Sequence, residues 1–109
     1  MALAESSYRL TTRFPKDEVY GMTSQIRRAA VSIAANIAEG HGRENSGSFV
    51  QFLRMSQGSL KELETHFLLS VRVRLTTEEA VEPLLGQADE LGRMLRSLIR
   101  AIQRKKSND

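Results

Sequence analysis

Apolar residues recur at spacings of three and four along almost the whole chain, which is the period of an amphipathic helix. The last segment shows this most clearly, in the stripe Val81, Leu84, Ala88, Leu91, Leu95, Leu98 and Ile102. The only prolines are Pro15 and Pro83, and no stretch alternates polar and apolar residues for the length of a strand. The sequence therefore predicts an all-α fold, an antiparallel up-and-down four-helix bundle with a shortened first helix. Pro83 lies in the opening turns of the last helix, where we expect an irregular start or a slight kink.

Capping residues and helix breakers give the predicted helix boundaries. Thr76 is followed three residues later by Glu79, which is the spacing of a capping box. Asn45 or Ser46 is the expected cap of the preceding helix, and Gly40 is expected as a left-handed residue after a helix end. We expect helices near residues 2–13, 21–39, 46–74 and 77–105.

The first helix is too short for its partners. Its stripe consists of Leu3, Ser7, Leu10 and Phe14. At about 1.5 Å per residue, residues 1–13 span only about 20 Å, against about 40 Å for the helix that begins near Ser46. Part of the bundle groove would then stand open. We expect either a second copy to fill the groove or a fuller version of the chain to carry further residues of this helix.

Length and composition exclude several classes of protein. With 109 residues the chain is expected to form a single domain, residues 1–109. Its core is expected to be large enough to be stable without covalent cross-links such as disulfides. It has no cysteine, which excludes disulfides and thiolate zinc sites and suits a reducing compartment. No apolar run is long enough to span a membrane, and the start lacks the pattern of a signal peptide. We therefore expect a cytoplasmic protein without a membrane partner.

The predicted helix 21–39 is apolar on more than one side. In addition to an ordinary stripe of larger residues, it carries small apolar residues around much of the remaining surface. A helix that is apolar on most sides needs cover on most sides, and a four-helix bundle covers one stripe per helix. Such a helix either lies unusually deep or meets another chain through its small alanines. We expect the second, a homo-oligomer with contacts between subunits through Ala30, Ala34, Ala35 and Ala38.

A long run in this helix resembles a known family. The run is YGMTSQIRRAAVSIAANIAEG, residues 20–40, and further matches follow in residues 49–53 and 58–65. It is similar to the signature of the 23S rRNA intervening sequence proteins, and the resemblance covers nearly the whole chain from about Leu10. Members of that family usually carry a further turn or more of the first helix, often with a tryptophan, whereas this chain has none.

The resemblance implies an antiparallel four-helix bundle that associates as a ring of five. Some family members are encoded in insertions within the ribosomal RNA gene. A similar bundle is the accessory protein of diversity-generating retroelements, where it works with reverse transcriptase and nucleic acid. The resemblance therefore implies a pentamer of this chain, and RNA or a nucleic-acid-handling protein as its partner.

A polar line crosses the otherwise apolar helix 21–39. It consists of Arg28, Ser32, Asn36 and Glu39, at steps of four, four and three. Polar groups within an apolar surface require partners. One interpretation is a buried hydrogen-bonded network or ion pair that fixes the helix register. The other is that copies of the line face a shared axis in an oligomer and bind an ion or a polar ligand.

The end of the last predicted helix carries a cluster of bases, which we call the basic ridge. It consists of Arg93, Arg96, Arg100, Arg104, Lys105 and Lys106, with no acid among them. Such a cluster is typical of a solvated helix terminus, because cations are favourable at the negative end of the helix dipole. It would equally bind phosphates, by backbone shape and charge, because no aromatic residue interleaves it. The two hypotheses are thus a nucleic-acid-associated oligomer and a structural or protein-interaction module.

Candidates for catalysis are few. His41 lies between two glycines, and His66 lies four residues after Glu62, but the paired Glu-x-x-His units of a di-iron bundle are missing. Gly40 and Gly42 do not form a phosphate loop, because no strand precedes them and no Lys-Ser/Thr follows. We therefore expect no catalytic residue, no metal and no cofactor, and a protein that is not an enzyme.

Overall fold

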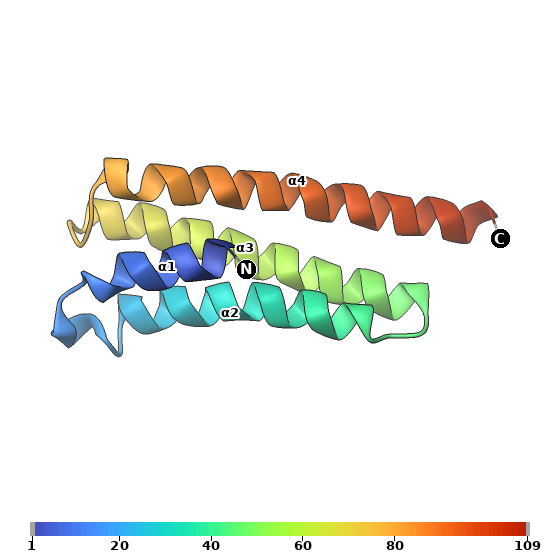
Figure 1. The fold of residues 1–109 in the computed structure, drawn as a ribbon, viewed down its shortest axis with the longest axis horizontal. Coiled ribbons are helices and arrows are strands. Elements are labelled where there is room, and N and C mark those ends of the chain that lie inside the picture. The colour runs from blue at the N-terminus through green and yellow to red at the C-terminus, as the bar shows by residue number, and fades with distance from the viewer. Residues whose placement is uncertain (1, 109) are drawn as a thin grey trace.

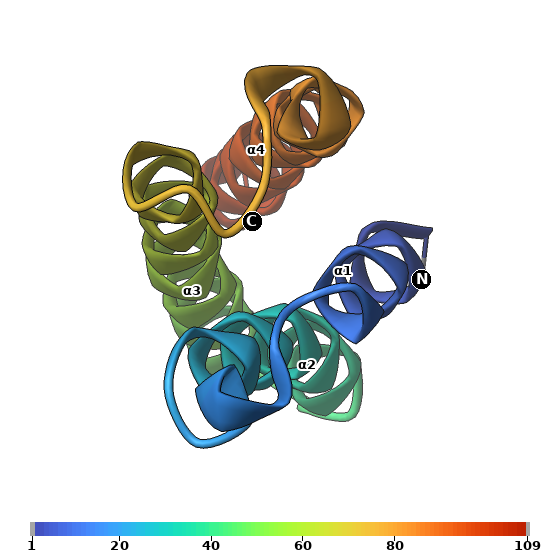
Figure 2. The ribbon, with the colours of Figure 1, turned by 90° about the vertical axis from the view of Figure 1, so that its left-hand side faces the viewer.

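The computed structural model describes the backbone of residues 2–108 and the side chains of residues 2–105. Four α-helices and one short 3₁₀ helix follow one another: α1 Ala2–Thr12, η1 Lys16–Glu18, α2 Met22–His41, α3 Ser46–Arg72 and α4 Glu78–Asn108. Helices that are adjacent in sequence run antiparallel and lie side by side (Figures 1 and 2). The predicted all-α four-helix bundle with a short first helix is confirmed. The helix α4 continues through Pro83 without interruption.

The core lies where the apolar stripes of the helices meet. Its fully buried members come mainly from the central pair α2 and α3, which includes Ile26, Ile33, Leu53, Leu63 and Phe67. Small hydroxyl side chains are buried among them, and several of these donate to backbone carbonyls, whereas Ser70 Oγ has no partner within the described residues. Ser56 of α3, for example, donates to the carbonyl oxygen of Ile33 in α2 at 2.9 Å. This bond joins the two helices at mid-length and fixes their register.

One arginine of α2 adds polar contacts to the apolar packing of the short helix α1. The Nε of Arg27 donates to Oγ1 of Thr11 at 2.9 Å, and its guanidinium lies 4.6 Å from the centre of the Tyr8 ring. Helix α1 has 11 residues, whereas α3 has 27 and α4 has 31. It therefore covers one half of the bundle and leaves the other half with three helices (Figure 1).

Of two helix caps predicted from the sequence, one is confirmed by the structure and the other is displaced by one residue. Asn45 caps α3 as expected, since its Oδ1 accepts the N–H of Ser48 at 2.7 Å. The cap of α4 is Thr77 rather than Thr76, and its Oγ1 accepts the N–H of Ala80 at 3.1 Å. The prediction of Thr76 as the cap was wrong. Leu75 still belongs to the closing turn of α3, so Thr76 only connects that turn to the cap of α4.

Gly40 was also predicted wrongly as a left-handed residue. It lies inside α2, which continues to His41, and no glycine among the described residues has a positive φ. The glycine is needed for a close approach of α2 to the first turns of α3. A Cβ at this position would lie 3.0 Å from Cδ1 of Phe49 and 3.1 Å from Cβ of Phe52.

The left-handed residue of this chain is an arginine at the end of α3. Arg74 has a φ of 66°, and the N–H of Leu75 donates to the carbonyl of Ser70 at 2.9 Å. The N–H of Arg74 itself donates to the carbonyl of Val71 at 3.1 Å. These two bonds form a Schellman motif, in which glycine is the favoured residue at the left-handed position.

Replacing Arg74 by glycine should therefore stabilise the protein. Removing the side chain relieves the left-handed strain of about 1 kcal/mol, and the gain should appear as a higher midpoint of urea denaturation. The matched control is Arg72→Gly, two residues earlier in the last turn of α3, which should cost about 1 kcal/mol. A lower midpoint for Arg74→Gly would contradict this reading of the turn.

Candidate nucleic-acid interface

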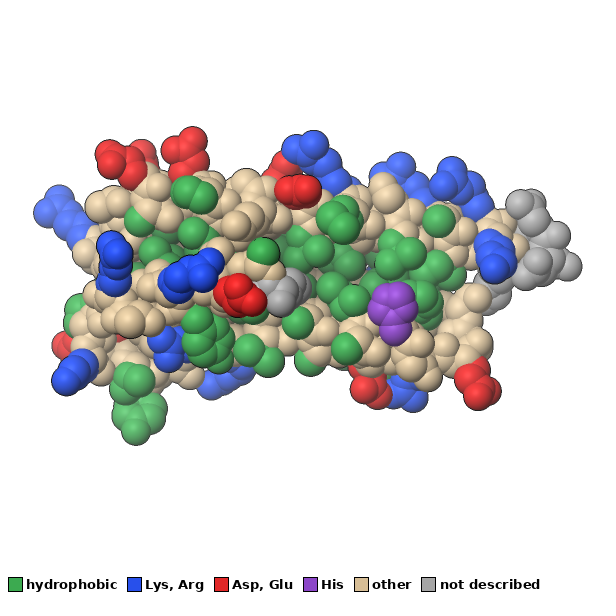
Figure 3. Space-filling model, viewed as in Figure 1, with side chains coloured by type: hydrophobic (Ala, Val, Ile, Leu, Met, Phe, Trp, Pro, Cys, Tyr) green, Lys and Arg blue, Asp and Glu red, His purple; other side chains and the backbone are tan. Residues whose placement is uncertain are grey.

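The basic ridge lies on the side of α4 that faces away from the core. Leu95 and Ile99 of the same helix are buried, whereas Arg96, Arg100 and Arg104 point outward and are exposed. Lys105 is exposed as well, and the side chain of Lys106 lies outside the described residues. Figure 3 shows acids over the first half of α4 and bases over its second half. The helix dipole accounts for this order, but it does not remove the positive charge from the surface.

The charge of the ridge is not uniform along its length. Arg93 forms an ion pair with Asp89, one turn earlier in α4. Arg96 lines a cleft between α3 and α4 together with Asp89 and Glu64, whose carboxylate pairs with Lys61 at 3.7 Å. Within the described part of the chain, no carboxylate pairs with Arg96, Arg100, Arg104 or Lys105. The part of the ridge that is purely basic therefore begins at Arg100.

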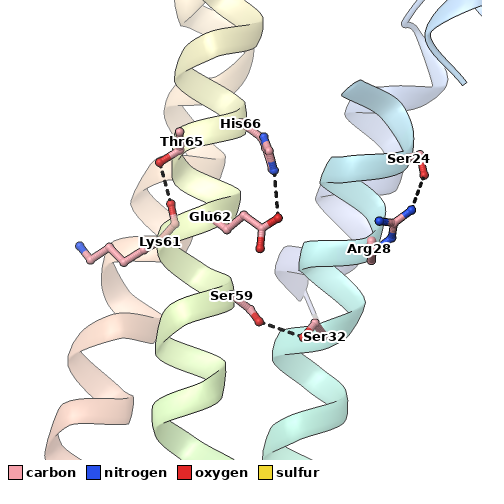
Figure 4. A network of polar contacts seen from close by, with 8 residues as sticks. All are labelled: Ser24, Arg28, Ser32, Ser59, Lys61, Glu62, Thr65 and His66. Atoms are coloured by element: carbon pink, nitrogen blue, oxygen red, sulfur yellow. Dashed lines mark hydrogen bonds and ion pairs between the residues drawn. The ribbon is translucent and has the colours of Figure 1, made fainter. Parts of the chain in front are cut away.

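The polar line of α2 is not a single network, and Figure 4 shows two of its members, Arg28 and Ser32, with separate partners. Ser32 Oγ lies 2.9 Å from Ser59 Oγ of α3, and Asn36 Nδ2 donates to the carbonyl of Ser32 at 2.9 Å. Arg28 and Glu39 point to partners near them in the chain. The first donates to Ser24 Oγ at 3.3 Å, and the second pairs with Arg43 at 2.7 Å.

The line is thus hydrogen-bonded, half-buried in its middle and exposed at its two ends. It links α2 to α3 through the two serines rather than through an ion pair. The sequence did not indicate Ser59 as the partner, because the two serines are 27 residues apart. An axial role of this line in an oligomer remains a prediction.

The alanines of α2 divide between core and surface. Ala30 is fully buried inside its own bundle, so it is a core residue and was wrongly predicted as a contact between subunits. Ala34 is half-buried, whereas Ala35 and Ala38 are exposed. Val31 lies among them and is also exposed. The outer side of α2 therefore presents small apolar side chains to the surroundings.

An apolar groove of about 530 Å³ opens between α2 and α4, beyond the start of α1. Ile37 of α2 lines one side, and Leu91, Met94 and Leu98 of α4 line the other. Figure 3 shows the hydrophobic side chains gathered in this half of the molecule. Met94 is 61% exposed. The open groove that the short first helix predicts is present, and the sequence did not single out Met94 as part of it.

The two histidines lie on different helices, His41 at the end of α2 and His66 in α3. The ring of His41 packs against Phe49 with 4.9 Å between ring centres, and His66 Nε2 lies 3.3 Å from Glu62 Oε1. No three His, Asp or Glu side chains within the described residues are placed to hold a metal ion. None of the described helices combines the length and the apolar composition that crossing a membrane requires.

Comparisons with known proteins agree with the fold. The model of the family described as 23S rRNA-intervening sequence protein matches residues 1–97. A crystal structure of a protein with unknown function, from the S23 ribosomal protein family of Bacteroides thetaiotaomicron, superimposes with a TM-score of 0.75. The two chains are 23% identical, and the match covers 89% of this chain and 97% of the other. No curated protein matches. Because the family model spans most of the sequence, this chain belongs to the 23S rRNA-intervening sequence protein family.

Proposed function

We propose that the protein is a non-enzymatic homo-oligomer that binds structured RNA through the basic ridge of α4. The single observation that carries this proposal is the charge of Arg96, Arg100, Arg104 and Lys105, which are all exposed and without an ion pair in the second half of α4. Guanidinium groups bind phosphates with two parallel hydrogen bonds. The ridge contains no aromatic residue, so it would recognise the shape and charge of an RNA backbone rather than its bases.

Self-association is part of the proposal because one ridge alone offers few contacts. Each phosphate that a base neutralises contributes a term from counterion release, and several ridges that act together bind more tightly than one. The surfaces available for assembly are the apolar groove and the small apolar side of α2 with Ala34, Ala35 and Ala38. The family resemblance points to a ring of five, and we propose a pentamer on that basis.

The groove gives a direct test of assembly. Replacing Met94 by glutamate places a charge in the groove, which should weaken self-association, because a buried and unpaired carboxylate is costly at an interface. Sedimentation velocity should show a multiple of the single-chain mass for the original protein and a shift toward the single chain for the variant. The matched control is Met55→Glu on α3, since Met55 is 49% exposed and lies outside the groove. An original protein that sediments as a single chain at tens of micromolar would contradict the proposal.

RNA binding itself is tested by electrophoretic mobility shift with a structured RNA hairpin. We expect a shift at about 50 mM salt that weakens at about 200 mM, because phosphate contacts release counterions. A protein that assembles but does not shift the RNA at low salt would favour a protein-interaction module instead. In that case, the apolar groove with its exposed Met94 would be the surface that carries the function.

A further inference from the structure

A second pocket lies at the other end of α4 from the basic ridge. It opens between α1 and the start of α4, and its volume is about 530 Å³. Leu10 near the end of α1, Phe14 in the turn after it and Leu84 of α4 form the apolar floor of the pocket, and all three side chains are buried. Neither the ridge nor the apolar groove contributes a residue to it. The pocket thus combines an apolar floor with walls that are polar.

One wall carries two arginines without partners. Arg9 and Arg13 both line the pocket and are exposed, and neither side chain forms a hydrogen bond or ion pair in the described part of the chain. Other arginines of the chain do find partners, for example Arg27 with Thr11 and Arg43 with Glu39. Arg9 lies in α1 and Arg13 in the turn that follows it, and two like charges that line one pocket repel each other. A bound anion would relieve this repulsion.

The facing wall carries hydroxyl groups and no acid. Thr76 and Thr77 line the pocket opposite the arginines. Thr77 Oγ1 accepts the N–H of Ala80, which leaves its own O–H free to donate. Glu78, the first residue of α4, lines the separate cleft between α3 and α4. No carboxylate therefore competes with an anion for the donors of this pocket.

We propose that this pocket binds a phosphate monoester that carries a compact apolar or aromatic group. The phosphate carries roughly two negative charges at neutral pH, which matches the two guanidinium groups, whereas a carboxylate carries one. The apolar group lies on the floor formed by Leu10, Phe14 and Leu84. The site is independent of the proposed RNA binding, because it shares no residue with the ridge.

The test is isothermal titration calorimetry of the full chain with phenyl phosphate. We expect saturable binding with one site per chain and a Kd of about 1 mM or lower. Phenol and inorganic phosphate, which each carry one half of the probe, should bind at least about tenfold more weakly. Titrations with adenosine monophosphate and hexyl phosphate then distinguish a nucleotide from an alkyl phosphate as the source of the ligand.

Two variants locate the site. Arg9→Gln with Arg13→Gln should weaken phenyl phosphate binding at least about tenfold, because two charge-assisted contacts are lost. Ala80→Leu fills the pocket without changing its charge and should weaken binding by a similar factor. Arg72→Gln, an exposed arginine of α3, is the matched control and should bind as the original does. The proposal is overturned if no saturable binding occurs below about 10 mM. It is equally overturned if inorganic phosphate binds as tightly as the ester, or if either pocket variant binds unchanged.

Discussion

Replacing Leu63 by alanine should lower the free energy of unfolding by about 2 to 5 kcal/mol. The side chain of Leu63 is fully buried in the middle of α3, the helix that packs against both α2 and α4. Its truncation leaves a cavity that rigid neighbouring helices close only in part. A domain of this size has a total stability of about 5 to 15 kcal/mol, so the loss is a large fraction of it.

The measurement is urea denaturation, followed by circular dichroism, at one fixed protein concentration so that any assembly contributes equally. Leu68→Ala is a matched control, because the same change is made five residues later in α3 at a side chain that is 54% exposed. It should cost less than about 1 kcal/mol. Equal losses for the two variants would mean that the core does not lie between α2, α3 and α4 as described.

Changing Arg96, Arg100 and Arg104 together to glutamate should weaken RNA binding at least about 100-fold. Each phosphate contact is replaced by repulsion, and the counterion-release contribution of the ridge is lost. The three side chains lie outside the core, so helicity and assembly should be nearly unchanged. Acids near the negative end of the α4 dipole should cost about 0.3 to 1 kcal/mol each. Folding is therefore checked by circular dichroism and mass by sedimentation.

The matched control reverses the same number of charges far from the ridge. Lys16, Arg72 and Arg74 are exposed and lie at the opposite end of the bundle from Arg100 and Arg104. Their joint change to glutamate lowers the net charge by the same amount. It should weaken RNA binding by less than about tenfold, because only the long-range attraction changes. If the two triple variants lose the same affinity, net charge rather than the ridge determines binding.

The fold was predictable because it follows from a periodicity of the sequence. The stripe from Val81 to Ile102 repeats at the spacing of a helix, and only the inner face of α4 is buried. Local signals for helix ends were less certain, because one residue type has more than one use. A glycine at position 40 fits a left-handed turn as well as a close approach of two helices, and only the position of Phe49 and Phe52 distinguishes them.

The candidate sites were predictable only where their residues are close in sequence. The basic ridge follows from arginines at helical spacing within a single segment. Arg93 pairs with Asp89, which precedes the acid-free run that defines the ridge, so the run by itself does not indicate this pair. The pocket of Arg9 and Arg13 also contains Thr77, which is more than sixty residues away in the chain. No local pattern connects such residues before the chain is folded.

The measurement that tests the proposed function most directly is the salt dependence of RNA affinity for the unaltered protein. The logarithm of the binding constant, plotted against the logarithm of the salt concentration, falls with a slope of roughly 0.7 to 0.9 per phosphate contacted. A single ridge with Arg96, Arg100, Arg104 and Lys105 offers about four such contacts, and a slope steeper than about 4 is expected if several ridges of one oligomer act together. A slope near zero, or no detectable binding at about 50 mM salt, would contradict the proposal that this family member binds RNA through α4.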